Sequence, residues 1–144
     1  MRVIIIHHLE SVWSDGYAKA GTNFDEQAEE LVKWLKAQEY SRVILTRCEE
    51  WTLGHEHEEH GLEEWVDDVY PYGYGWEEGQ EGDGCDWIEG GTHSEVLPVF
   101  NWQKGLRGCE VDLCGGFDGE CLEDMEISLQ GAGVKFNRIH HLIV

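Results

Sequence analysis

Short apolar runs alternate along the chain with a longer amphipathic stretch. Residues 3–6 are all apolar and β-branched, which predicts a strand buried on both faces. Residues 24–39 carry apolar side chains at helical spacing with charged side chains between them, which predicts a helix that covers a sheet. Residues 42–46, which contain the apolar Val43, Ile44 and Leu45, predict a second strand. A strand, a helix and a strand in this order predict a right-handed crossover between parallel neighbours.

The last third of the chain shows the same alternation around a glycine turn. The short run at residues 111–114 stops at Gly115 and Gly116, and Asp118 is suited to cap the helix that follows. The final run, residues 136–144, predicts a strand that ties the chain end into the sheet. The predicted helix carries apolar residues at helical spacing, namely Leu122, Met125, Leu129 and Ala132.

The middle of the chain differs in composition from both ends. Residues 48–103 contain no Lys or Arg but 16 Asp or Glu. We interpret residues 49–95 as an acidic, aromatic- and glycine-rich insertion, because structureless loops of this length are uncommon in compact domains. The pattern also predicts a helix over residues 56–69 and an edge strand over residues 95–100. We therefore expect residues 1–144 to form a single three-layer α/β domain of Rossmann-like type with a mainly parallel sheet.

The charge of the chain restricts its partners. The formal net charge is −20, and nucleic acids and anionic membranes both require a basic surface, so neither is expected as a partner. No apolar run approaches the length that spans a membrane. The five cysteines, an odd number, are typical of free thiols in a reducing compartment. We expect a cytoplasmic protein with a small-molecule ligand, and a homo-oligomer is compatible with the sequence.

Cys121 is the candidate nucleophile. It lies in the first turn of the helix predicted after Asp118, where backbone N–H groups are unpaired and the helix dipole is positive. Both features favour the thiolate over the thiol. The alternative, a small buried core residue, is common for a cysteine on a half-apolar helix face and stays open.

Polar residues at the ends of the predicted strands are further candidates. His7 and His8 follow the first strand, and ligands of open α/β sheets bind outside the carboxyl ends of the strands. Either histidine is therefore a candidate site residue or a structural one. Lys104 stands alone among many acidic residues, as a salt-bridge partner or as a cation that lowers the pKa of a nearby thiol.

A histidine cluster in the acidic segment is the candidate metal site. His55, His57 and His60 alternate with glutamates, and imidazole and carboxylate groups are ligands for zinc, iron or nickel. Their spacing matches no recognised signature, so a solvated helix end that titrates near neutral pH is the alternative. The cofactor expected is one divalent metal ion.

Together these elements resemble the isochorismatase and nicotinamidase-like cysteine hydrolases. In that family the nucleophile begins a helix of about a dozen residues that ends at a glycine before the next strand, and the interval from Cys121 to Gly133 is similar. The resemblance implies that Cys121 is the nucleophile and that Lys104 matches the family lysine. It also implies a metal at His55, His57 and His60. Small sequences of this kind look like degenerate family members encoded by phages or mobile elements.

The resemblance implies hydrolysis of an amide or related bond in a small metabolite, with His8 shuttling the proton. Two features depart from the family pattern: a histidine stands where the first strand should end in aspartate, and the turn before the cysteine lacks the usual Thr-Asp pair. The alternatives are a non-catalytic small-molecule-binding protein, whose glycine turn cradles an anion, and an acidic protein that binds a cationic partner. The residues expected to contact the substrate are His7, Gly115, Gly116, Phe117, Asp118, Trp51 and Trp76.

Overall fold

The computed structural model of the protein describes residues 1–7, 24–47, 62–71, 101–116, 118, 119 and 121–144. Within these ranges, five strands form one sheet, and every neighbouring pair is parallel. The order across the sheet is β3-β2-β1-β4-β5. The strands are β1 (Arg2–His7), β2 (Arg42–Arg47), β3 (Asp68–Pro71), β4 (Glu110–Gly115) and β5 (Phe136–Ile143).

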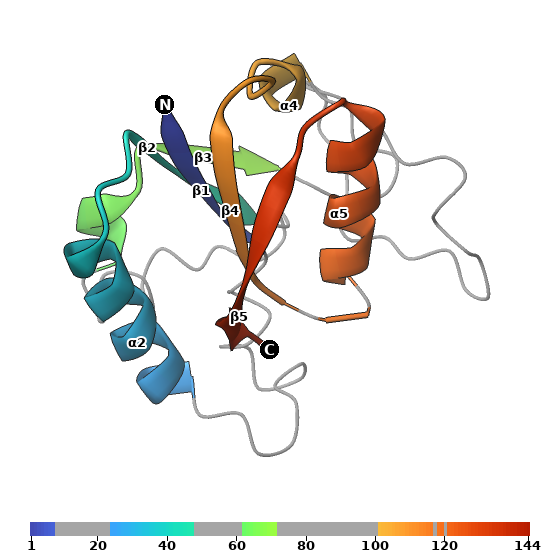
Figure 1. The fold of residues 1–144 in the computed structure, drawn as a ribbon. Coiled ribbons are helices and arrows are strands. Elements are labelled where there is room, and N and C mark those ends of the chain that lie inside the picture. The colour runs from blue at the N-terminus through green and yellow to red at the C-terminus, as the bar shows by residue number, and fades with distance from the viewer. Residues whose placement is uncertain (8–23, 48–61, 72–100, 117, 120) are drawn as a thin grey trace.

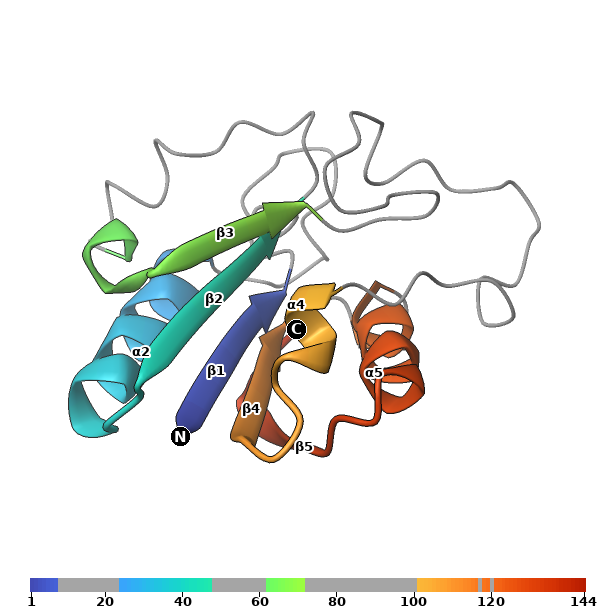
Figure 2. The ribbon, with the colours of Figure 1, turned by 90° about the horizontal axis from the view of Figure 1, so that it is seen from above.

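Helices cover both faces of the sheet (Figures 1 and 2). Helix α2 (Phe24–Ala37) lies on one face, together with the short 3₁₀ helix η1 (Glu63–Trp65). Helix α5 (Cys121–Gly131) and the short α4 (Asn101–Lys104) lie on the other face. The described residues therefore form the predicted α/β architecture, with helices on either side of an entirely parallel sheet.

The central strand β1 explains the continuous apolar run near the start of the chain. Its side chains alternate between the faces, so that Val3 and Ile5 pack with α5 while Ile4 and Ile6 pack with α2. All four are fully buried, and burying each one stabilises the fold by about 1.5–3 kcal/mol. Both faces of the strand are covered along these four residues, which is why the alternating pattern of a half-exposed strand is absent there.

One predicted element is wrong in its described part. The helix expected over residues 56–69 is not formed from Leu62 onward, because only Glu63–Trp65 are helical and β3 begins at Asp68. Val69 and Tyr70 favour an extended chain and pair with β2. Arg42 fixes this pairing, since Nε donates to Asp68 and Nη2 donates to the Tyr70 hydroxyl. The first part of the predicted helix and the strand predicted over residues 95–100 lie outside the described residues.

A buried ion pair lies in the amino-terminal half of the sheet. Asp112 on β4 is almost fully buried, and its Oδ2 accepts hydrogen bonds from Arg2 Nη2 (3.1 Å) and the Tyr40 hydroxyl (2.7 Å). Trp34 Nε1 donates to the same hydroxyl at 2.9 Å. Burial, together with the bond to Asp112, raises the pKa of Tyr40, so the phenol keeps its proton and remains a donor.

The length and hydropathy of the helices bear on membrane insertion. Among the helices of the described ranges, none is long and apolar enough to cross a membrane.

Candidate functional site

The strand order defines where a ligand site is expected. From β1 the chain adds β2 and β3 on one side and β4 and β5 on the other, so the order reverses between β1 and β4. Open α/β sheets bind ligands outside the carboxyl ends of the strands at such a reversal. The last residues of these two strands, His7 and Gly115, are direct neighbours in the register. We call this edge, the carboxyl ends of β1 and β4 with the start of α5, the switch-point edge (Figure 1).

The His7 side chain lies inside the protein at this edge. It is fully buried, as is Thr46 at the equivalent position of β2. Nδ1 of His7 and Oγ1 of Thr46 share a hydrogen bond of 2.6 Å, and the same Oγ1 lies 3.5 Å from the carbonyl oxygen of Ile6. The ring therefore joins the ends of two strands, while its expected contact with a substrate stays a prediction.

Gly115 and Gly116 allow β4 to approach β1 closely. Gly115 has a φ of 107°, and a Cβ atom at this position would lie 2.1 Å from the carbonyl oxygen of His7. The N–H of Gly116 donates to that same oxygen at 2.9 Å. The close approach of β4 to β1 therefore requires glycine at position 115, because a Cβ atom there would overlap the His7 backbone. Because the Gly116 N–H is already bonded within the protein, this turn is poorly suited to cradle an anion.

The segment between β4 and α5 is also fastened to the end of β5. The carbonyl oxygen of Gly115 accepts a hydrogen bond from the N–H of Val144 at 3.0 Å. The N–H of Asp118 donates to the carbonyl oxygen of Val144 at 2.7 Å. Backbone bonds thus tie Gly115, Gly116 and Asp118 to the ends of the two strands that neighbour β4.

Helix α5 begins at Cys121, which confirms that this residue lies in the first turn. Leu122, Met125 and Leu129 are fully buried against the sheet, as their spacing predicts. Asp118 lies three residues before the helix begins. The side chain of Cys121 itself lies outside the described part of the structure, so its reactivity stays a prediction.

Arg138 is a site residue that sequence reasoning missed. From β5, its Nη2 donates to Asp118 Oδ1 and its Nη1 donates to Glu126 Oε1, both at 2.7 Å. It thereby joins the turn before α5 to the body of that helix. The signal in the sequence is that Arg138 is the one Lys or Arg in the last predicted strand, close to an acidic helix.

Lys104 is the last residue of the short helix α4, which packs against α5. The residue before it, Gln103, accepts a hydrogen bond from Ser128 at 2.9 Å, and Arg107 donates to the carbonyl oxygen of Ala132. Helix α4 therefore contacts the second half of α5 (Figure 1). Seven residues separate Cys121 from Ser128, which corresponds to roughly 10 Å along a helix. Gln103 Nε2 also donates to Met125 Sδ at 3.5 Å, one turn after Cys121, and the role of exposed Lys104 stays a prediction.

Several candidate residues lie outside the described part of the chain, and their roles stay predictions. Within the described ranges, no group of three or more His, Cys, Asp or Glu side chains is arranged to hold a metal ion. The predicted metal ligands are not among these ranges, so the metal is untested. The residues outside the description are His8, Trp51, His55, His57, His60, Trp76 and Phe117.

Cys109 and Cys114 are free thiols that differ in exposure. Cys114 is fully buried against the α2 face of the sheet, and burial raises the pKa of its thiol, with the charge of Asp112 adding to the rise. Cys109 is only partly buried. Cys114 therefore serves the core, and Cys109 provides an internal reference for thiol reactivity.

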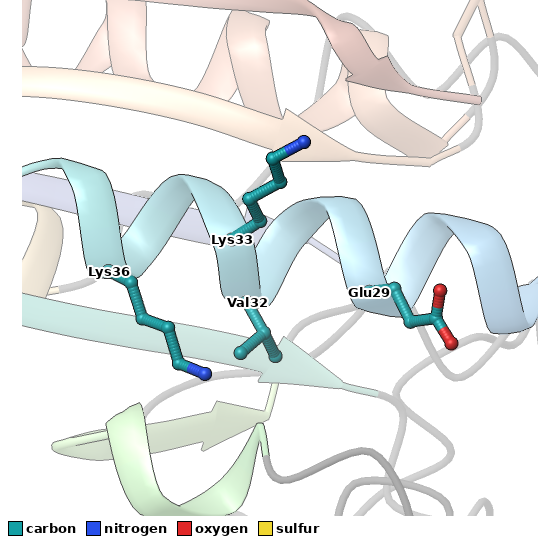
Figure 3. Close-up of a pocket in the computed structure, with 4 residues that line it drawn as sticks. All are labelled: Glu29, Val32, Lys33 and Lys36. Carbon is teal, nitrogen blue, oxygen red and sulfur yellow. The ribbon is translucent and has the colours of Figure 1, made fainter.

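A hollow of about 290 Å³ lies along the outer side of α2 (Figure 3). The described residues that line it are Glu29, Val32, Lys33 and Lys36, and their side chains point in different directions. Ligand sites normally combine an apolar lining with a few convergent polar groups. These four side chains lack that arrangement, and the hollow belongs to a single helix surface, not to the switch-point edge.

Comparison with known proteins identifies no relative of the chain. No protein-family model matches the chain, and no curated protein or solved structure matches it significantly. The functional interpretation therefore depends on the chain's own residues and their geometry.

Proposed function

We propose that the protein is a cysteine hydrolase that cleaves an amide or related bond of a small molecule, with Cys121 as the nucleophile. One observation carries the proposal: α5 begins with Cys121 directly after β4, at the edge where the strand order reverses. A nucleophile at this position is close to the ligand site expected for an open α/β sheet. The backbone bonds of Gly115, Gly116 and Asp118 support it further, because they tie these three residues to the ends of β1 and β5, beside the start of α5.

The proposed reaction has two steps. The Cys121 thiolate adds to the carbonyl carbon, and the N–H groups of the first turn of α5 stabilise the oxyanion. The C–N bond then breaks, the leaving amine takes a proton delivered by His8, and a thioester remains. Water attacks the thioester and gives up a proton to His8, which releases the acid and restores the Cys121 thiolate and the protonated His8. A divalent ion held by His55, His57 and His60 would orient the substrate.

The rate of alkylation at each cysteine tests this proposal. With iodoacetamide at pH 7, we expect Cys121 to react about tenfold faster than Cys109, because a helix start lowers a thiol pKa. Cys114 should stay unmodified while the protein is folded, since it is fully buried. Peptide mass spectrometry after timed quenching measures each site, and Cys121→Ser with Cys109→Ser identifies the fast signal. Equal, slow modification of Cys121 and Cys109 would exclude an activated nucleophile.

A non-catalytic binding protein is the second candidate. One observation favours it: the last residue of β1, where the hydrolases that the chain resembles carry an aspartate, is His7, whose ring is buried and bonded to Thr46. The same edge would then bind a small molecule without turning it over. Fast alkylation of Cys121 counts against this alternative. A slow Cys121 combined with a ligand-induced rise in melting temperature from a metabolite panel would favour it.

A further inference from the structure

Arg138 connects two acidic side chains that lie on either side of Cys121 in the sequence. Asp118 precedes Cys121 by three residues and Glu126 follows it by five, and each accepts one bond of 2.7 Å from the guanidinium. The two bonds therefore span the first turn of α5, with one anchor before it and one after it. The Glu126 side chain is 17 % exposed, which makes it the firmer anchor of the two.

The first turn of a helix is the part that most needs such an anchor. Its N–H groups have no partner inside the helix, and helix ends fray. In α5 these N–H groups are the ones that would stabilise the Cys121 thiolate and the oxyanion. A planar guanidinium suits the task, because its fork bonds two acceptors at once in a fixed geometry.

We propose that Arg138 is a positioning residue, which holds the Asp118 turn against α5 and so keeps the first turn, with Cys121, in its reactive geometry. This inference rests on the proposed function. It assigns to Arg138 the support for the nucleophile that the family resemblance assigned to Lys104.

The charges around Arg138 indicate that it acts through geometry. The guanidinium faces the carboxylates of Asp118 and Glu126, and Glu123 also acts on Glu126 through its charge. One positive charge among three carboxylates leaves the surroundings negative, which does not favour a thiolate. The contribution of Arg138 is therefore the two-point bond, and a lysine cannot reproduce a planar fork.

Arg42 offers a matched control. Its side chain is 26 % exposed, against 28 % for Arg138, and it also bonds two partners, Asp68 and Tyr70. These contacts lie on β2 and β3, away from α5. Arg42→Met therefore removes a comparable fork without touching the segment that carries Cys121.

The experiment compares Arg138→Met, Arg138→Lys and Arg42→Met in the full chain. The alkylation rate of Cys121 by iodoacetamide is measured from pH 5 to 9, well below the melting temperature of the least stable variant. We expect Arg138→Met to slow the reaction at pH 7 about tenfold and to move the midpoint of the pH profile upward, because the first turn loses its fixed N–H donors. Arg138→Lys should resemble Arg138→Met, and Arg42→Met should resemble the wild type.

Two results would overturn the inference: an unchanged rate in Arg138→Met, or full rescue by Arg138→Lys, which would show that charge alone matters. Amide hydrogen exchange separates this inference from the proposed function. If Cys121 of the wild type is unreactive, the hydrolase proposal fails, but Arg138→Met should still speed exchange at the amides that close the first turn of α5, those of Met125 and Glu126, and not in α2. Unchanged exchange at these amides would show that Arg138 does not hold the first turn of α5. If Arg138→Met does not fold, Asp118→Asn weakens the same fork at an exposed position.

Discussion

The two ends of the parallel sheet use polar groups in different ways. In the amino-terminal half, Asp112 is buried and bonds Arg2 and Tyr40, so side chains from three segments meet at one carboxylate. At the carboxyl end, the contacts between β1 and the turn after β4 are made by the backbone of His7 and the glycines. The first arrangement stabilises the sheet through buried charge. The second fixes the path of a turn, which is what a site at that edge requires.

The largest expected effect is on the free energy of unfolding, and it differs between Gly115 at the carboxyl end of β4 and Gly108 before its amino end. Gly115→Ala should lower the free energy of unfolding by about 3–5 kcal/mol, because the new Cβ would overlap the His7 carbonyl and the backbone would be strained. Gly108, in the turn before β4, also has a positive φ, but a Cβ there meets nothing within 4 Å. Gly108→Ala should therefore cost only about 1–2 kcal/mol.

Urea unfolding followed by tryptophan fluorescence and circular dichroism measures both variants. The comparison depends on the difference between the two glycines, not on either value alone. Equal losses at positions 115 and 108 would mean that positive φ accounts for both and that the approach of β4 to β1 is not sterically tight.

The second prediction concerns the buried carboxylate. Asp112→Ala leaves the Arg2 guanidinium and the Tyr40 hydroxyl without their shared acceptor, which should cost about 2–4 kcal/mol. Glu110→Ala is the control on the same arginine, because Glu110 is 64 % exposed and lies 3.9 Å from Arg2. Its removal should change stability by less than about 0.5 kcal/mol. Both values come from urea unfolding.

The Asp112→Ala variant also tests whether the amino-terminal half of the sheet is independent of the site at its carboxyl end. Under conditions in which Asp112→Ala remains folded, Cys121 should alkylate at the wild-type rate, since Asp112 is paired with Ile4, on the face of the sheet that α2 covers, and α5 lies on the other face. A slower Cys121 in this variant would show that the amino-terminal half also controls the site, and the comparison would fail.

The sequence predicts the core of the fold because that core follows hydrophobic patterning. The run at residues 3–6 and the spacing of Leu122, Met125 and Leu129 report burial directly, and burial is local information. Strand β3 was missed because its stability comes from pairing with β2 and from Arg42, which lies 26 residues before Asp68. The local pattern of apolar and polar residues does not show which distant residue will become a partner.

The candidate site shows the same limit. The position of Cys121 at a helix start follows from local spacing, and the structure confirms it. The packing of α4 against α5 through Gln103, Met125 and Ser128 joins residues more than 20 positions apart, which spacing cannot supply. Arg138 was missed for a related reason, since its two partners are 20 and 12 residues away in sequence. The sequence therefore predicts the element to which a single residue belongs, but not which distant residues lie beside it in the fold.

The smallest expected effect is a pH dependence at Glu126, one anchor of the Arg138 fork. Burial raises the pKa of Glu126 above its ordinary value of 4.5; Arg138 opposes the rise, whereas Asp118 and Glu123 add to it. The folded state then binds this proton more tightly than the unfolded state does. The carboxyl contribution to stability is therefore fully present below the unfolded pKa and is lost as pH rises through the folded pKa.

Glu126→Gln cannot ionise, so the variant lacks this loss. The free energy of unfolding of Glu126→Gln minus that of the wild type should become more positive, by less than about 1 kcal/mol, as pH rises through the window that starts near 4.5. Urea unfolding at half-unit steps from pH 4 to 7 measures the difference. Glu29→Gln removes one negative charge from an exposed site on α2 and corrects for the net charge of −20. If the stability difference changes with pH by the same amount in both variants, the effect comes from general repulsion among the negative charges of the chain. A slope confined to Glu126→Gln would mean that burial, against the opposing charge of Arg138, raises the pKa of this carboxyl.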